Sequence, residues 1–303
     1  IIISATEKPM RKYVSSEHLT LFSTPWNWKT GENESIDDAL ERLRHKDLSG
    51  YRVKTIRSGQ MLECEIYPIW KTQSEAGRAR KALASRPAQE KLNEKNAKKH
   101  IMRLVNTNFT NSDCWGTFGY DDDQLPASPE EAKRDLVNFL RRIARRRKKL
   151  GLEPMKYLYV TEWASEDGEP VRCHHHVILS GGMDRDEVES LWGHGAYPQV
   201  RRLRVKQDGG LNGLACYLAK NSRQYKRWGR SQNLKEPLIS IADKKITARQ
   251  VERMVRDQIE ARELIAKKYP GYACEDMVVR FSPWVAGAYI SVMMHKMEMR
   301  RRA

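Results

Sequence analysis

The sequence predicts an α+β fold, a ferredoxin/RRM-like antiparallel sheet with helices on one face and extensions at both ends. Between residues 113 and 221, β-prone and helical segments follow one another in the order β-α-β-β-α-β-α. Two of these strands are joined by the turn-forming stretch 165–168, as in an antiparallel hairpin. An apolar content of 40% in 303 residues is enough to fill the core of such a fold.

The first half of this pattern is a strand followed by a capped helix. Residues 113–120 are aromatic and β-prone, and three aspartates end the segment. Ser128 supplies a helix N-cap, Pro129 suits the first helical position, and Glu131 completes a capping box. Apolar side chains then recur at helical spacing at Leu136, Phe139, Leu140 and Ile143. The sequence therefore predicts an amphipathic helix after the first strand.

The second half begins with the hairpin. Residues 156–163 and 171–180 have strand composition on either side of the predicted turn. Asp184 then caps a short helix, residues 198–205 favour a strand, and residues 211–221 favour a last helix. These elements belong to a central domain that we place at residues 91–237.

Two regions flank the central domain. Residues 1–90 are predicted to form an N-terminal extension of unknown role, with two strands in 52–71 around the turn at Ser58 and Gly59. The basic stretch 78–103 has a helix-favouring composition interrupted by Pro87, and it is either a phosphate-binding segment or a solvated helix face.

The last 66 residues, 238–303, are predicted to form a C-terminal subdomain. Thr247 and Gln250 form a capping box at the start of an amphipathic helix, and residues 284–294 have strand composition.

Composition narrows the partners and the compartment. Lys and Arg outnumber Asp and Glu by 55 to 39, a formal charge of +16, which favours nucleic acid as the partner. Five widely spaced cysteines without a C-x-x-C pair argue against a disulfide framework and fit a reducing cytoplasm. Because no apolar run approaches ~18 residues, we expect neither a membrane span nor a signal peptide.

The end of the predicted helix after Ser128 is strongly basic. Cations favour a helix C-terminus, but this run exceeds what capping requires and indicates a phosphate-binding stripe. The predicted DNA-binding residues are Arg141, Arg142, Arg145, Arg146, Arg147 and Lys148.

A histidine pair in the second hairpin strand predicts a metal site. His174 and His176 are two residues apart, so their imidazoles project from one face while His175 points the other way. Glu162 lies across the turn on the preceding strand, from which its carboxylate can reach the same face. Two imidazoles and a carboxylate suit a divalent ion, Mn or Mg for phosphate chemistry, or Zn by affinity.

The last predicted helix carries Tyr217 and Lys220, which share a helix face at i and i+3. Alone, this pair is typical of an amphipathic helix edge. Its position downstream of the histidines gives it more significance.

Taken in order, these motifs resemble the HUH endonuclease superfamily, and in particular the rolling-circle replication initiators of microviruses, filamentous phages and plasmids. Residues 115–120 resemble the first family motif, with Gly116 and Phe118 as departures from its usual pattern. Residues 173–179 resemble the metal motif, and residues 217–220 resemble the Y-x-x-K motif. Downstream, residues 231–237 also resemble a segment of the phage-type proteins, so that the resemblance covers roughly half of the chain.

The resemblance implies an HUH nickase domain in which Tyr217 is the nucleophile, Lys220 its electrostatic helper, and His174, His176 and Glu162 the metal ligands. Asn221 occupies the place of a second tyrosine found in some relatives, which points to the single-tyrosine class. The implied activity is nicking and rejoining of single-stranded DNA at a replication origin in a bacterial host. Since the chain has no P-loop signature, a host helicase and polymerase are expected partners. A relaxase or transposase, and a non-catalytic metal-containing DNA-binding protein, remain the alternatives.

Overall fold

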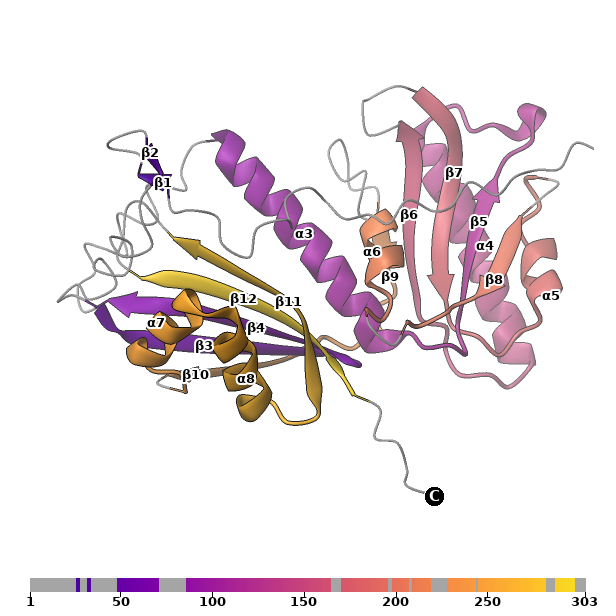
Figure 1. Ribbon diagram of the computed structural model, residues 1–303. Helices are drawn as coiled ribbons and strands as arrows, with labels where there is room; N and C mark the ends of the chain where they lie inside the picture. Colours follow the sequence, from indigo (N-terminus) through magenta and orange to yellow (C-terminus); the bar gives the residue numbers. More distant parts are fainter. Residues whose placement is uncertain are drawn as a thin grey trace, which may run out of the picture.

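The structure is a computed structural model of the chain. It describes residues 26–27, 32–33, 48–70, 86–164, 170–195, 198–206, 209–218, 228–243, 245–281 and 287–297. These residues form two five-stranded antiparallel sheets, several helices and a small strand pair (Figure 1). The small pair consists of β1 (Trp26–Asn27) and β2 (Glu32–Asn33). The predicted α+β class is confirmed.

The first sheet has the strand order β8-β5-β7-β6-β9, and each neighbouring pair is antiparallel. Its strands are β5 (Cys114–Gly119), β6 (Tyr157–Ala164), β7 (Pro170–Leu179), β8 (Gln199–Arg202) and β9 (Trp228–Arg230). The predicted hairpin is confirmed as β6 and β7, with β7 at the centre of the sheet. The register places Glu162 directly opposite His174.

One face of this sheet is covered by α4 (Pro129–Lys149) and α5 (Arg185–Ser190). The N-cap predicted at Ser128 is confirmed, because its hydroxyl accepts a hydrogen bond from the backbone N–H of Glu131 at 3.2 Å. Phe139 of α4 packs in the same buried cluster as Phe118 of β5 and Trp192, which follows α5. A short 3₁₀ turn, η2 (Asp122–Gln124), precedes α4.

The opposite face of the sheet is also covered, which differs from the one-faced arrangement expected of the core. It packs against α3 (Arg86–Asn108) and α6 (Asn212–Leu218). The physical reason is that β6 and β7 are apolar on this face too, with Leu158 and Ile178 fully buried. Pro87, expected to interrupt a helix, lies in the first turn of α3, where its missing N–H breaks no helical hydrogen bond.

The second sheet joins the two flanking regions that the sequence predicts as separate pieces. Its order is β10-β3-β4-β12-β11. The strands are β3 (Leu48–Ser58), β4 (Met61–Trp70), β10 (Leu238–Asp243), β11 (Tyr272–Phe281) and β12 (Ala288–Lys296). The predicted division into a 1–90 extension and a 238–303 subdomain is therefore corrected: strands of both regions form one sheet. An isolated β3–β4 hairpin is marginal in water, whereas five strands with a buried face are stable.

Two helices, α7 (Ala248–Arg256) and α8 (Gln258–Lys268), pack on one face of the second sheet around Val251, Met254 and Ile265. The predicted capping box at Thr247 and Gln250 is present. The predicted C-terminal strand is β12, displaced a few residues from its expected range.

The helix α3 connects the two sheets and lies between them in Figure 1. Arg103 of α3 makes a bidentate ion pair with Glu63 of β4, at 2.8 and 2.7 Å. Asn106 of α3 donates to the side-chain carbonyl of Asn212, the first residue of α6, at 2.8 Å. The β3–β4 turn requires Gly59, because φ is +59° and a Cβ there would lie 2.1 Å from the Asn106 carbonyl oxygen. The placement of α6 is thus tied to both sheets through α3.

Candidate metal centre and adjacent tyrosine

Strand alternation and register bring the predicted ligands together. Glu162, His174 and His176 lie on the same face of β6 and β7, on the side covered by α3 and α6. The Nε2 atom of His174 is 3.4 Å from one Glu162 carboxylate oxygen, and Nε2 of His176 is 3.6 Å from the other. One ligand atom from each of the three side chains lies within 4.8 Å of the others. The cluster can therefore hold a metal ion.

Hydrogen bonds to the far ring nitrogens orient both imidazoles. Nδ1 of His174 lies 2.9 Å from the carbonyl oxygen of Arg172, to which it can donate. Nδ1 of His176 lies 3.1 Å from the hydroxyl oxygen of Thr117 on β5. Each contact leaves Nε2 directed at Glu162, and an Nδ1–H donor leaves the Nε2 lone pair for a metal. Sequence reasoning missed Thr117; its signal was the alternation that places it on the same face of β5 as Trp115.

His175 has a structural role on the other face of β7. Its side chain is fully buried, with Nε2 2.8 Å from the Tyr120 hydroxyl and Nδ1 2.8 Å from the Thr161 hydroxyl. Burial, together with the neighbouring histidines, lowers the pKa of His175 to about 3, so the imidazole is neutral at neutral pH.

The charge state of the cluster suits a cation. Burial lowers the pKa of His176 to about 4, which keeps this imidazole neutral and able to coordinate at neutral pH. The hydrogen bond to Glu162 raises the pKa of His174, which shows how strongly this carboxylate attracts positive charge. Two nitrogens and a carboxylate fit Mn, Mg or Zn, and this donor set does not distinguish among them.

Tyr217 lies directly beside the cluster. Its phenolic oxygen is 3.3 Å from Nε2 of His176, and the two rings meet edge to face with centroids 5.1 Å apart. Ala215 and Leu218 of α6 are buried against the sheet, while Tyr217 is 43% exposed and thus accessible to a large substrate. Partial burial and then the charge of Glu162 raise the pKa of Tyr217, so the phenol holds its proton at neutral pH. Lys220, the predicted helper, lies outside the described residues.

The predicted basic stripe does not join this cluster, because α4 covers the opposite face of the sheet. Arg142 donates to the carbonyl oxygens of Leu191 and Trp192 at 2.8 and 2.6 Å. Arg146 forms an ion pair with Glu187. The remaining exposed members of the stripe are Arg141, Arg145 and Lys148.

Arg147 is buried and holds the loops at the end of the sheet. It donates to the carbonyl oxygens of Gly181, Ser180 and Glu153 at 2.7, 3.3 and 3.1 Å. For Arg147 and Arg142 the structure thus shows a role in the fold, not the predicted exposed phosphate contacts.

This role gives a first testable expectation. Arg147→Ala should lower the free energy of unfolding by about 2–4 kcal/mol, because three carbonyl oxygens lose a charged donor in a buried place. Arg145→Ala, on the exposed surface of the same helix, should change it by no more than about 0.5 kcal/mol. Urea unfolding followed by circular dichroism measures both, and equal stability of the two variants would contradict the assignment.

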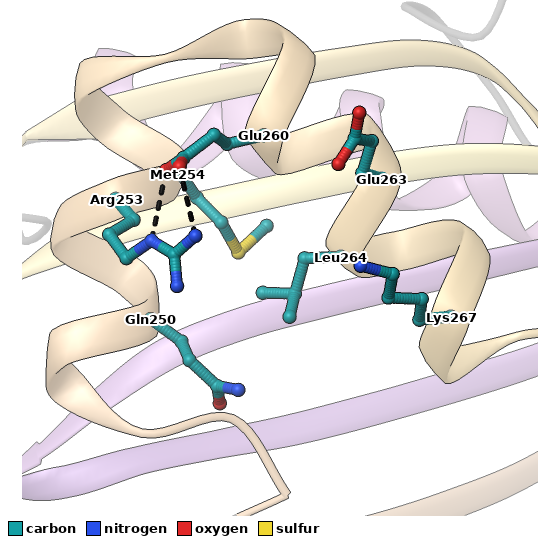
Figure 2. Close-up of a pocket in the computed structure, with 7 residues that line it drawn as sticks. All are labelled: Gln250, Arg253, Met254, Glu260, Glu263, Leu264 and Lys267. Atoms are coloured by element: carbon teal, nitrogen blue, oxygen red, sulfur yellow. Dashed lines mark hydrogen bonds and ion pairs between the residues drawn. The ribbon is translucent and has the colours of Figure 1, made fainter.

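A small hollow lies far from these residues in the chain, between α7 and α8 (Figure 2). Its volume is about 90 Å³, and the ion pair of Arg253 with Glu260 crosses one side of it. None of its lining residues belongs to the Glu162 cluster, and it is too small for a nucleotide.

The fold and site together define a class: an α+β protein whose sheet presents two imidazoles and a carboxylate beside an exposed tyrosine. Residues 113–222 match the model of a family of replication-associated proteins, the ORF2 type. That stretch runs from the start of β5 past the end of α6 and so contains the whole cluster and Tyr217. No curated protein and no solved structure matches the chain. The family match supports a role in initiating replication and implies DNA binding. Among the described residues, no helix is long and apolar enough to span a membrane.

Proposed function

We propose that this protein is a rolling-circle replication initiator of the HUH superfamily, single-tyrosine class, that nicks and rejoins single-stranded DNA with Tyr217. One observation carries the proposal: an exposed phenolic oxygen lies 3.3 Å from His176 in a cluster able to hold a metal ion. The family match over the same residues supports it.

In the proposed reaction the Tyr217 oxygen attacks a scissile phosphate and forms a new O–P bond. The bond from phosphorus to the 3′ oxygen breaks, and the departing oxygen takes up a proton as the phenol loses its own. The products are a 5′-phosphotyrosine and a free 3′-hydroxyl. Because the phosphotyrosine retains a phosphodiester bond, the 3′-hydroxyl of a DNA strand can reverse the step and rejoin the strand without ATP.

The side chains of the cluster have separate roles in this proposal. Glu162, His174 and His176 would hold a divalent ion, which supplies a Lewis acid for a non-bridging phosphate oxygen. Thr117 and the Arg172 carbonyl fix the two imidazoles. Because the pKa of Tyr217 is raised, its ionisation needs nearby positive charge, and we assign part of that charge to Lys220.

The protein would leave the later steps to its host. A host polymerase would extend the free 3′-hydroxyl and a host helicase would separate the strands, in the cytoplasm of a bacterial host. A relaxase or transposase would use the same chemistry for strand transfer.

The orienting role of Thr117 gives a second testable expectation. Thr117→Val should weaken Mn²⁺ binding by about 10–100-fold, because His176 loses the partner that fixes its tautomer and ring orientation. The matched control is Thr161→Val, which removes a hydroxyl from the structural His175 on the other face. Isothermal titration calorimetry with Mn²⁺ measures both, and unchanged affinity in Thr117→Val would remove the positioning role.

The function itself is tested by incubating the protein with a pool of single-stranded oligonucleotides and Mn²⁺, then sequencing covalently captured DNA ends. An initiator should capture 5′ ends that share one sequence. Capture of no ends despite metal and DNA binding would support the non-catalytic alternative, a DNA-binding protein with a structural ion.

A further inference from the structure

The observation that carries a further inference is a groove between α4 and residues 151–157, on the face of the first sheet away from Tyr217. Its volume is about 870 Å³, within the range of pockets that take a drug-sized ligand or several side chains. We propose that this groove binds a short acidic peptide segment with apolar side chains, belonging to a partner protein. The proposal does not depend on nuclease activity.

The floor and walls of the groove are largely apolar. Val137, Leu140 and Ala144 contribute from α4, while Leu152 and Tyr157 contribute from the opposite side. Ala144 is exposed, and its small side chain leaves the middle of the helix face open. Half-buried apolar groups around such a hollow gain free energy when a partner's apolar side chain displaces water, at about 25 cal/mol per Å². The occupant is therefore expected to insert aliphatic or aromatic side chains.

Cations at the rim determine the charge of the occupant. Arg141 and Lys148 are exposed on the groove side of α4, separated by two helical turns, or about 10 Å. Arg147 also lines the groove, but three backbone carbonyls occupy its guanidinium. Glu153 is the acidic residue of the lining, so the groove remains net positive.

The spacing of the two exposed cations indicates a peptide pattern. An extended chain advances about 3.3 Å per residue, so two acidic residues three positions apart would face Arg141 and Lys148. The residues between them would direct their apolar side chains to the floor. We therefore expect a motif of two acidic residues flanking an apolar pair.

Single-stranded DNA is the competing occupant, because the same cations attract phosphates. The observations favour the peptide for two reasons. Backbone phosphates gain nothing from the apolar floor, and α4 lies across the sheet from the tyrosine that would act on DNA. A partner bound at α4 would leave the Tyr217 face accessible.

The test is selection from a random dodecapeptide phage library on the full-length protein, followed by fluorescence anisotropy with the most enriched peptide. We expect enrichment of acidic residues flanking aliphatic or aromatic ones. Arg141→Glu should weaken binding of that peptide by about tenfold or more, and Ala144→Glu, which fills the groove with a like charge, should abolish it. Lys133→Glu is the matched control, since it reverses an exposed charge on α4 outside the groove lining and should change affinity by no more than about twofold.

Three results would overturn the proposal. The first is a selection that enriches no sequence, or enriches basic peptides. The second is an enriched peptide that binds Ala144→Glu as tightly as the unsubstituted protein. The third is displacement of the peptide by a 20-nucleotide oligothymidine whose own binding is lost in Ala144→Glu, because the groove would then be a DNA site. Circular dichroism of each variant shows that lost binding is not lost folding.

Discussion

Tyr217→Phe is expected to reduce covalent capture of DNA by a factor on the order of 10⁴ or more, as for removal of an enzyme's nucleophile. Phenylalanine retains the ring that packs edge to face on His176 but lacks the oxygen that must bond to phosphorus. Binding of single-stranded DNA should persist, because the substitution removes no charge.

The decisive measurement uses an oligonucleotide labelled on the 3′ side of the nick, so that the fragment with the 5′-phosphate carries label into the protein band. The unsubstituted protein should give a labelled band that survives boiling in SDS. Tyr159→Phe is the matched control, because Tyr159 lies on the other face of β6 and the same atom is removed there.

Two results would contradict the assignment of Tyr217. A labelled band that persists in Tyr217→Phe would move the nucleophile to another residue, and Tyr225 is the first to test. Metal-dependent cleavage without any adduct would mean that water attacks, and the initiator proposal would then be wrong. Lys220→Ala should only slow the reaction, by about 10²–10³-fold, since a cation stabilises charge but forms no bond.

The second large effect concerns the ligand cluster. His174→Ala, His176→Ala and Glu162→Ala are each expected to abolish nicking and to weaken Mn²⁺ binding by at least about 100-fold, because each removes one of three donors that converge within 4.8 Å. Calorimetric Mn²⁺ titration and the labelled-adduct assay measure the two effects separately.

The control for this prediction is His175→Ala, in the same strand and of the same residue type. It removes a buried imidazole that contacts Tyr120 and Thr161, so it should lower the free energy of unfolding by about 1–3 kcal/mol. The folded fraction should still bind Mn²⁺ with unchanged affinity. Full nicking activity in His174→Ala and His176→Ala with Mn²⁺ supplied would refute the metal assignment.

Local rules made much of this protein predictable from its sequence. Helix caps at Ser128 and Thr247 depend on residues three positions apart, and both are present. Strand alternation has a period of two, so it was enough to separate His174 and His176 from His175. The short hairpin turn then placed Glu162 opposite His174. The order of motifs along the chain was sufficient to predict the class of protein that the family match supports.

Contacts between distant segments were decided only by the tertiary structure. No local pattern shows that β3 pairs with β10, which lies far along the chain, or that both faces of the first sheet need helices. A run of arginines has the same sequence signature whether its side chains meet phosphates or, like Arg147, buried carbonyls. Thr117 and Tyr217 converge on His176 from elements far apart in the sequence, and only the burial of apolar side chains between α6, α3 and the sheet brings them there.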